Sequence, residues 1–262
     1  MMIARDFSYC ATPFAAMAHR GGGAWGPNIG KENTLHAFAQ AVSLGYRYLE
    51  TDLQVTSDER LVCFHDDNLK RVTGQDGQVC EMSSAELGEV RVSGEPIPFF
   101  DDVVEAFPDV RFNLDLKAEG VIRLLVKAIR AHRLQDRILV DSFSQARLSQ
   151  FRAATRGQIP TAMAPWGVAW TALVPLLGRL IASPGVAVQV PVRTSWGRLG
   201  LEIVTPQTIE AIHSIGKVIH VWTIDQPAEM ERLIDMGVDG IITDRPDLLK
   251  DILVRRNLWE YA

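Results

Sequence analysis

The sequence predicts an α/β protein with a closed (β/α)8 barrel, the TIM-barrel fold. Apolar runs typical of buried parallel strands alternate along the chain with stretches of helical period. Eight such units fit into 262 residues, the usual size of one barrel domain, so we expect residues 1–262 to form a single domain. With 47% hydrophobic and 23% charged residues, the composition is that of an ordinary globular protein, which disfavours disordered, collagen-like and coiled-coil structures.

The eight predicted strands are short apolar runs separated by helical stretches. They cover residues 15–20, 48–55, 110–117, 138–143, 159–164, 186–192, 218–224 and 240–243. The clearest helices are expected over residues 34–44 behind an Asn33 cap, 121–131, 206–215, and 227–236 ending at Gly237.

One strand-like run, residues 61–65, does not fit this alternation. Only residues 56–60 separate it from the second strand, and a parallel return needs about a dozen residues or more. The two runs should therefore pair in antiparallel fashion. We expect residues 56 to about 105 to form an inserted loop and hairpin segment at the carboxyl face of the barrel, where long loops usually carry function.

The overall charge gives no attraction to polyanions. Twenty-seven basic and thirty-two acidic residues leave a net charge of −5, so nucleic acid is not an expected partner.

The three cysteines, Cys10, Cys63 and Cys80, are far apart and form no metal or disulfide pattern. They are expected to be reduced thiols of a cytoplasmic protein, and the amino-terminal residues do not resemble a secretory signal.

The longest uncharged stretch covers residues 157–178, but Pro160, Pro165 and Pro175 interrupt it, so a membrane span is not expected. Its apolar part, residues 163–178, either packs on the barrel as a helix and loop or makes a peripheral membrane contact. The sequence leaves the oligomeric state open.

Carboxylates recur on one face of two predicted strands. Glu50 and Asp52 share a face of the second strand, and Asn113, Asp115 and Lys117 share a face of the third. Carboxylates that converge inside a barrel repel one another, and a hard divalent cation is the usual remedy. We therefore predict one Mg²⁺ or Ca²⁺ ion; the alternative is a set of ion pairs with Arg47, Arg111 or Lys117.

Two histidines lie at the ends of apolar strands, where barrel active sites form. His19 ends the first predicted strand and His65 ends the hairpin strand, so the two are candidates for an acid and base pair. The other four histidines lie in helical stretches or inside a strand and are expected to be surface or core residues. They are His36, His132, His213 and His220.

Several motifs in order resemble the glycerophosphodiester phosphodiesterase family, from about Ala18 to Leu249. They are His19-Arg20-Gly, Glu32-Asn33-Thr34, Glu50-x-Asp52, His65-Asp66-x-x-Leu69-x-Arg71-x-Thr73-Gly74, Ile97-Pro98, Asn113-x-Asp115-x-Lys117, Val221-Trp222-Thr223 and Gly237-Val-Asp-Gly-Ile-Ile-Thr-Asp-x-Pro246. The resemblance implies a TIM barrel with one divalent cation that hydrolyses glycerophosphodiesters, small molecules, to an alcohol and glycerol 3-phosphate.

The resemblance also assigns roles to individual residues. It makes His19 and His65 the acid and base, and Glu50, Asp52 and Asp115 the metal ligands. Arg20 and Lys117 would hold the phosphate, and Glu32 would lie near the metal or orient His19. The family usually has a glutamate at the position of Asp115, and the stretch between His19 and Glu32 is longer than its common form.

Two further residues are candidates for substrate contacts. Trp222 ends the seventh predicted strand and is either a stacking surface for the substrate or a core residue. Gln189 faces inward on the sixth. Two other functions stay open: a lysophospholipase D that takes a lipid-tailed phosphodiester, and a barrel that binds a phosphodiester without hydrolysing it.

Overall fold

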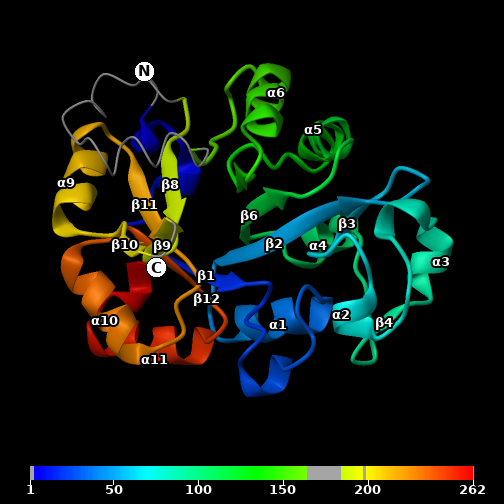
Figure 1. Cartoon of the computed structure of the whole chain (residues 1–262), viewed down its shortest axis with the longest axis horizontal. Coiled ribbons are helices and arrows are strands. Elements are labelled where there is room, and N and C mark those ends of the chain that lie inside the picture. The colour runs from blue at the N-terminus through cyan, green and yellow to red at the C-terminus, as the bar shows by residue number, and fades with distance from the viewer. Residues whose placement is uncertain (1–2, 164–183, 197–198, 262) are drawn as a thin grey trace.

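The computed structural model describes residues 3–163, 184–196 and 199–261. Its main sheet contains seven parallel strands that curl around a common interior, with helices outside (Figure 1). In spatial order these are β7 (Ile138–Asp141), β6 (Arg111–Leu116), β2 (Tyr48–Val55), β1 (Ala15–His19), β12 (Gly240–Thr243), β11 (Val218–Val221) and β8 (Ala187–Val190). The predicted TIM-barrel fold is confirmed.

The barrel closes through two single bridges rather than a regular strand. Val140 of β7 pairs with Thr161, and Ala162 pairs with Ala187 of β8, both in parallel fashion. The predicted strand over residues 159–164 is therefore reduced to this contact within the described part of the chain. Pro160 has no N–H to donate, which shortens the ladder at this position.

The main helices follow their strands and cover the outside of the barrel. They are α1 (Leu35–Ser43), α4 (Phe100–Ala106), α5 (Val121–His132), α6 (Gln145–Thr155), α9 (Pro206–Ser214), α10 (Pro227–Met236) and α11 (Pro246–Arg255). Short 3-10 turns cover Ala4–Asp6, Ser8–Cys10, Gly26–Asn28, Val79–Glu81 and Trp259–Tyr261.

The cap of α1 differs from the expectation. Thr34, not Asn33, is the N-cap, and its side chain accepts a hydrogen bond from the backbone N–H of Ala37 (3.2 Å). Asn33 has a left-handed backbone (φ +57°), which turns its side chain toward β2. There it donates to Asp52 and accepts from Thr51, so its role is to hold the strand that carries the carboxylates.

Successive residues of the barrel strands alternate between the apolar core under the helices and the barrel interior. Phe112, Leu114 and Leu116 of β6 face the helices and belong to the large apolar cluster, whereas Asn113 and Asp115 alternate with them and face the barrel interior. A smaller cluster, which includes Met17, Leu139 and Ile242, fills the interior beneath the polar rim. The expected alternation along the strands is therefore present.

The segment after β2 forms its own small structure beside the barrel, with β3 antiparallel to β2 as predicted (Figure 1). It contains β3 (Leu61–Cys63), α2 (Lys70–Thr73), α3 (Ser84–Gly88), β4 (Arg91–Val92) and β5 (Glu95–Pro96). A separate apolar cluster stabilises it, whereas α4, at its end, packs into the large cluster. A further hairpin, β9 (Arg193–Trp196) with β10 (Leu199–Glu202), was not predicted.

The structure also bears on the predictions for the cysteines and for a membrane span. All three cysteines are free, and Cys63 is buried. Within the described ranges, no helix has the length and apolar character needed to cross a bilayer. Apart from Met163, the apolar stretch 163–178 lies outside the described residues.

We predict that Gly185→Ala destabilises the barrel at its closure. A Cβ atom at Gly185 would lie 2.5 Å from the backbone oxygen of Ala162, and backbone on both sides cannot move aside cheaply. The free energy of unfolding, measured by chemical denaturation, should fall by about 1–3 kcal/mol or more. Gly88→Ala is the matched control, because apart from its chain neighbours and its own helix no heavy atom lies within 4 Å of its Cβ position, so it should not destabilise the protein. If Gly185→Ala stays within about 0.5 kcal/mol of wild type, the closure is looser than described.

Candidate active site

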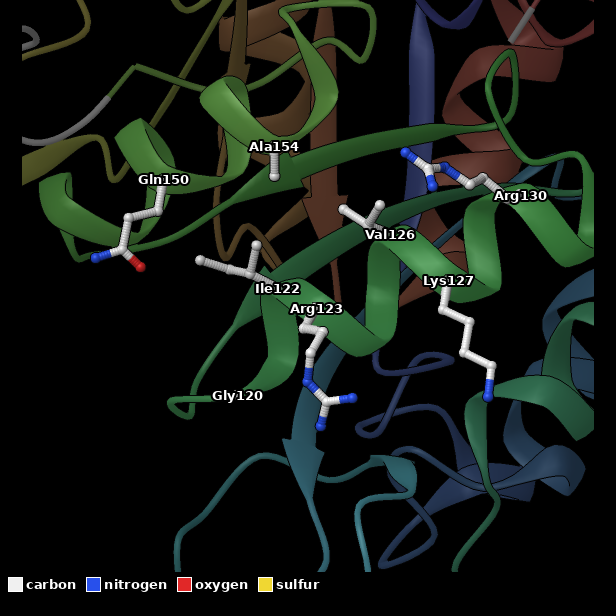
Figure 2. Close-up of a pocket in the computed structure, with 8 residues that line it drawn as sticks. All are labelled: Gly120, Ile122, Arg123, Val126, Lys127, Arg130, Gln150 and Ala154. Atoms are coloured by element: carbon white, nitrogen blue, oxygen red, sulfur yellow. The ribbon is translucent and has the colours of Figure 1, made fainter.

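A cavity of about 160 Å³ lies at the carboxyl ends of the barrel strands. Nine of the ten predicted site residues line it; only Glu32 does not. A larger hollow of about 650 Å³ lies between α5 and α6, where Arg123, Lys127 and Arg130 project from α5 (Figure 2). The residues that line this hollow include no carboxylate and no histidine, so it lacks acid–base groups and is not the candidate site.

Strand register brings the predicted carboxylates together. In the β2–β6 ladder Asp52 lies beside Asp115, and in the β1–β2 ladder His19 lies beside Glu50. Glu50, Asp52 and Asp115 are 6%, 1% and 7% exposed. Their charges are thus removed from water, which is costly unless nearby groups compensate them.

Two cations contact this cluster. The Lys117 ammonium lies 2.6 Å from a carboxylate oxygen of Asp115 and 3.1 Å from one of Asp52. The Arg20 Nε lies 3.2 Å from the other Asp52 oxygen. The ion-pair alternative is therefore correct for Lys117, whereas Arg111 lies over the ring of Tyr48 instead.

The two cations do not neutralise the three carboxylates equally. Burial opposes ionisation of Asp52, but Lys117 and Arg20 outweigh it and lower its pKa. Burial, with repulsion from Asp52 as the next cause, raises the pKa of Glu50 to about 8. Burial also raises the pKa of Asp115. Fully ionised, the three carboxylates would carry more negative charge than the two cations neutralise, and the raised pKa values of Glu50 and Asp115 show that protons are retained there until further positive charge binds.

The donor atoms of the site suit a hard cation. The Oδ1 atom of Asp115 is buried and has no hydrogen-bond partner, and such an orphan oxygen calls for a ligand. Carboxylate oxygens are the ligands that Mg²⁺ and Ca²⁺ prefer. Among the described residues, no three acidic, histidine or cysteine side chains are arranged closely enough to hold a metal ion. Lys117 and Arg20 contact the carboxylates in this arrangement.

His19 is held from both sides. Its Nδ1 lies 2.9 Å from a carboxylate oxygen of Asp244, and its Nε2 lies 3.8 Å from Glu50. Burial lowers the pKa of His19, but the two carboxylates outweigh it, so the net shift is upward. Asp244, at the end of β12, thus has the orienting position that the sequence had suggested for Glu32.

His65 is held by a chain of charged groups from the inserted segment. Its Nδ1 lies 2.5 Å from Asp66, and Asp66 accepts from the Arg71 guanidinium (2.6 Å). Arg71 also binds Glu32 (2.7 Å), which in turn pairs with Arg20 (3.0 Å). Glu32 therefore connects the supports of His65 and Arg20, and α2, which carries Arg71, positions the second histidine.

The floor of the cavity is an amide network. The side chains of Asn113 and Gln189 bond to each other, and the Gln189 amide also donates to Nδ1 of His220 (3.1 Å). Burial lowers the pKa of His220 to about 4. Gln189 thus lines the cavity as predicted, although its amide is largely engaged by the protein.

Aromatic rings form the mouth. Trp222 lies edge-to-face against Phe143, with ring centroids 6.0 Å apart, and Phe143 is 64% exposed. Phe143 and the inward Asp141 were missed by the sequence analysis, although the parity of β7 places Asp141 on the same face as Leu139. Burial, followed by repulsion from Asp115, raises the pKa of Asp141 to about 7.

Paired histidines held by carboxylates at the rim of a barrel, beside the cations Arg20 and Lys117, are typical of a hydrolase of phosphate esters. The family model described as "Glycerophosphoryl diester phosphodiesterase family" matches residues 19–248. The chain therefore belongs to this family and is a phosphoric diester hydrolase.

Individual proteins are similar to the chain over most of its length. The chain is 36% identical over 253 residues to "Probable glycerophosphodiester phosphodiesterase 2" of Mycobacterium tuberculosis, covering 94% of this chain and 93% of that protein. It is 26% identical to human "Lysophospholipase D GDPD1", covering 90% and 85%. The crystal structure of an Oleispira antarctica phosphodiesterase in complex with the product sn-glycerol-3-phosphate superposes with a TM-score of 0.74 at 22% identity, covering 94% and 99%.

We predict that His220 sets part of the acid sensitivity of the fold. Its pKa falls from 6.5 to about 4 on folding, so between these values the unfolded chain binds more protons and stability decreases as the pH falls. The loss should reach about 3 kcal/mol by pH 4. His220→Asn keeps an acceptor for Gln189 and should flatten this part of the stability profile. His36→Asn, on α1 outside the barrel, retains His220 and should keep the wild-type slope; equal slopes in all three proteins would contradict the assignment.

Proposed function

We propose that the protein hydrolyses glycerophosphodiesters to an alcohol and glycerol 3-phosphate. His19 and His65 act as the acid and base, and Glu50, Asp52 and Asp115 hold one divalent cation, Mg²⁺ or Ca²⁺. The observation that carries the proposal is that two histidines, each held at Nδ1 by a carboxylate, line the same cavity as the buried carboxylates. The Nε2 atoms are then the ones left for proton transfer to and from the substrate.

A charge count supports this substrate class. Three carboxylates and a phosphodiester carry four negative charges, and a divalent cation, Arg20, Lys117 and one protonated histidine carry five positive charges. The near balance suits a site that excludes water. Arg20 and Lys117 bind the phosphate, and the neutral histidine accepts a proton from the nucleophile while the protonated one donates to the leaving oxygen. When bound, the cation supplies Lewis acidity to a phosphoryl oxygen.

Replacing either histidine tests the acid–base roles. His19→Ala and His65→Ala should each lower kcat for glycerophosphocholine by about 10²–10⁴-fold, because general acid–base catalysis contributes that much. The matched control is His132→Ala, whose side chain pairs with Asp101 away from the cavity and should leave kcat unchanged. Activity within about tenfold of wild type in either site variant would remove that histidine from the mechanism.

The cation is tested by removal and by the length of one side chain. Chelation should abolish hydrolysis, and adding Mg²⁺ or Ca²⁺ should restore it. Asp115→Asn should weaken cation binding, measured by calorimetry, by at least about tenfold, whereas Asp115→Glu, which keeps the charge, should be tolerated. Undiminished activity in chelator, or an equal loss for both variants, would contradict the ligand assignment.

The same assays separate the alternatives. A lysophospholipase D, the name of a human relative, would turn over a lysophospholipid at least as well as glycerophosphocholine. The exposed ring of Phe143 beside Trp222 is an apolar edge that would suit a lipid tail. A barrel that only binds phosphodiesters would bind both compounds and hydrolyse neither, but this alternative is disfavoured because both histidines and their supports are in place.

A further inference from the structure

Three aspartates stand side by side on three neighbouring strands. In the parallel ladders, Asp52 of β2 lies beside Asp115 of β6, and Asp115 lies beside Asp141 of β7. All three face the barrel interior and line the same cavity. Neighbouring strands are about 4.8 Å apart, so consecutive side chains in this aspartate row are close enough to share a ligand.

The protein's own cations form ion pairs with only two of the three aspartates in this row. Lys117 contacts Asp52 and Asp115, and Arg20 contacts Asp52, but no ion pair reaches Asp141 from any residue that the structure describes. One carboxylate oxygen of Asp141 accepts the neighbouring backbone N–H of Ser142 (2.7 Å). The ion pairs are therefore concentrated at the β2 end of the row, whereas at the β7 end Lys117 and Arg152 act on Asp141 only from a distance, without an ion pair.

An independent observation marks the β6–β7 end as a place for a ligand. The Oδ1 atom of Asp115 is buried without a hydrogen-bond partner, although Asp115 is only 7% exposed and lines the cavity. Its other oxygen is the one that Lys117 occupies. A hard cation that uses this orphan oxygen would lie next to the strand that carries Asp141.

We propose that Asp141 is a fourth carboxylate of the cation site, acting together with the free oxygen of Asp115. The cation would then neutralise the end of the aspartate row that the two protein cations do not reach. The inference rests on the cation of the proposed function, but it is tested by cation binding alone and does not require turnover.

The test is calorimetric titration of the full chain with Ca²⁺ or Mg²⁺ in the absence of substrate. Asp141→Asn, which keeps the shape and removes the charge, should weaken binding by about tenfold or more, comparable with Asp115→Asn. Asp251→Asn, an exposed change of the same kind on α11, is the matched control and should bind as wild type. Asp141→Ser serves as a second variant if the asparagine protein does not fold.

Stability separates a ligand of the cation from a structural group. Without cation, removing one of several repelling carboxylates should raise the melting temperature of Asp141→Asn, while the additional stabilisation by Ca²⁺ should shrink. A purely structural aspartate would instead lower the cation-free melting temperature.

Each outcome decides a different claim. A loss of cation affinity of more than about threefold in Asp141→Asn, with a cation-free melting temperature that is not lowered, supports Asp141 as part of the site. Binding within about threefold of wild type, or a lowered cation-free melting temperature, overturns it and leaves the proposed hydrolysis intact. Wild-type protein that binds the cation through Asp141 but does not cleave glycerophosphocholine would retain this inference and remove the proposed function. Wild-type protein that binds no cation would overturn the inference outright.

Discussion

The burial of carboxylates at the rim of the barrel is the constraint on which the site depends. Glu50, Asp52 and Asp115 are almost fully removed from water, and their self-repulsion must be balanced locally. Arg20 and Lys117 balance part of it, which explains why one carboxyl has a lowered pKa while its neighbours have raised ones. The rim is consequently prepared for additional positive charge.

The fold supplies this arrangement through register and through the inserted segment. Parallel pairing sets equivalent positions of adjacent strands at one height, so that alternate residues of β2 and β6 meet without any contribution from flexible loops. The histidines need more support, because a strand end fixes a backbone but not an imidazole ring. Asp244 from the last strand supports His19, and Asp66 with Arg71 from the inserted segment supports His65. The inserted segment therefore helps to fix the geometry of the site.

Strand parity made the carboxylates of β2 and β6 predictable, because a period of two is a local property of the sequence. The partners of the histidines were harder to assign, since Asp244 is 225 residues from His19 along the chain and only closure of the barrel brings them together. The sequence predicted a strand over residues 159–164, but the closure at Thr161 and Ala162 is only a pair of bridges, because an apolar run does not show how many of its residues pair. Asn33 was expected to cap a helix by residue type alone, but its left-handed backbone gives that position to Thr34.

Lys117 shows why the ion-pair and cation interpretations are not exclusive. Its ammonium contacts Asp52 and Asp115, so in this arrangement the protein itself holds positive charge where a divalent ion would otherwise be required. An ammonium engaged by two carboxylates has little capacity left for a phosphate. A divalent cation carries twice the charge and would relieve both carboxylates, which frees Lys117 to turn toward the substrate. Under the proposed function, cation binding thus precedes effective phosphate binding, because one lysine cannot neutralise the rim and the substrate at once.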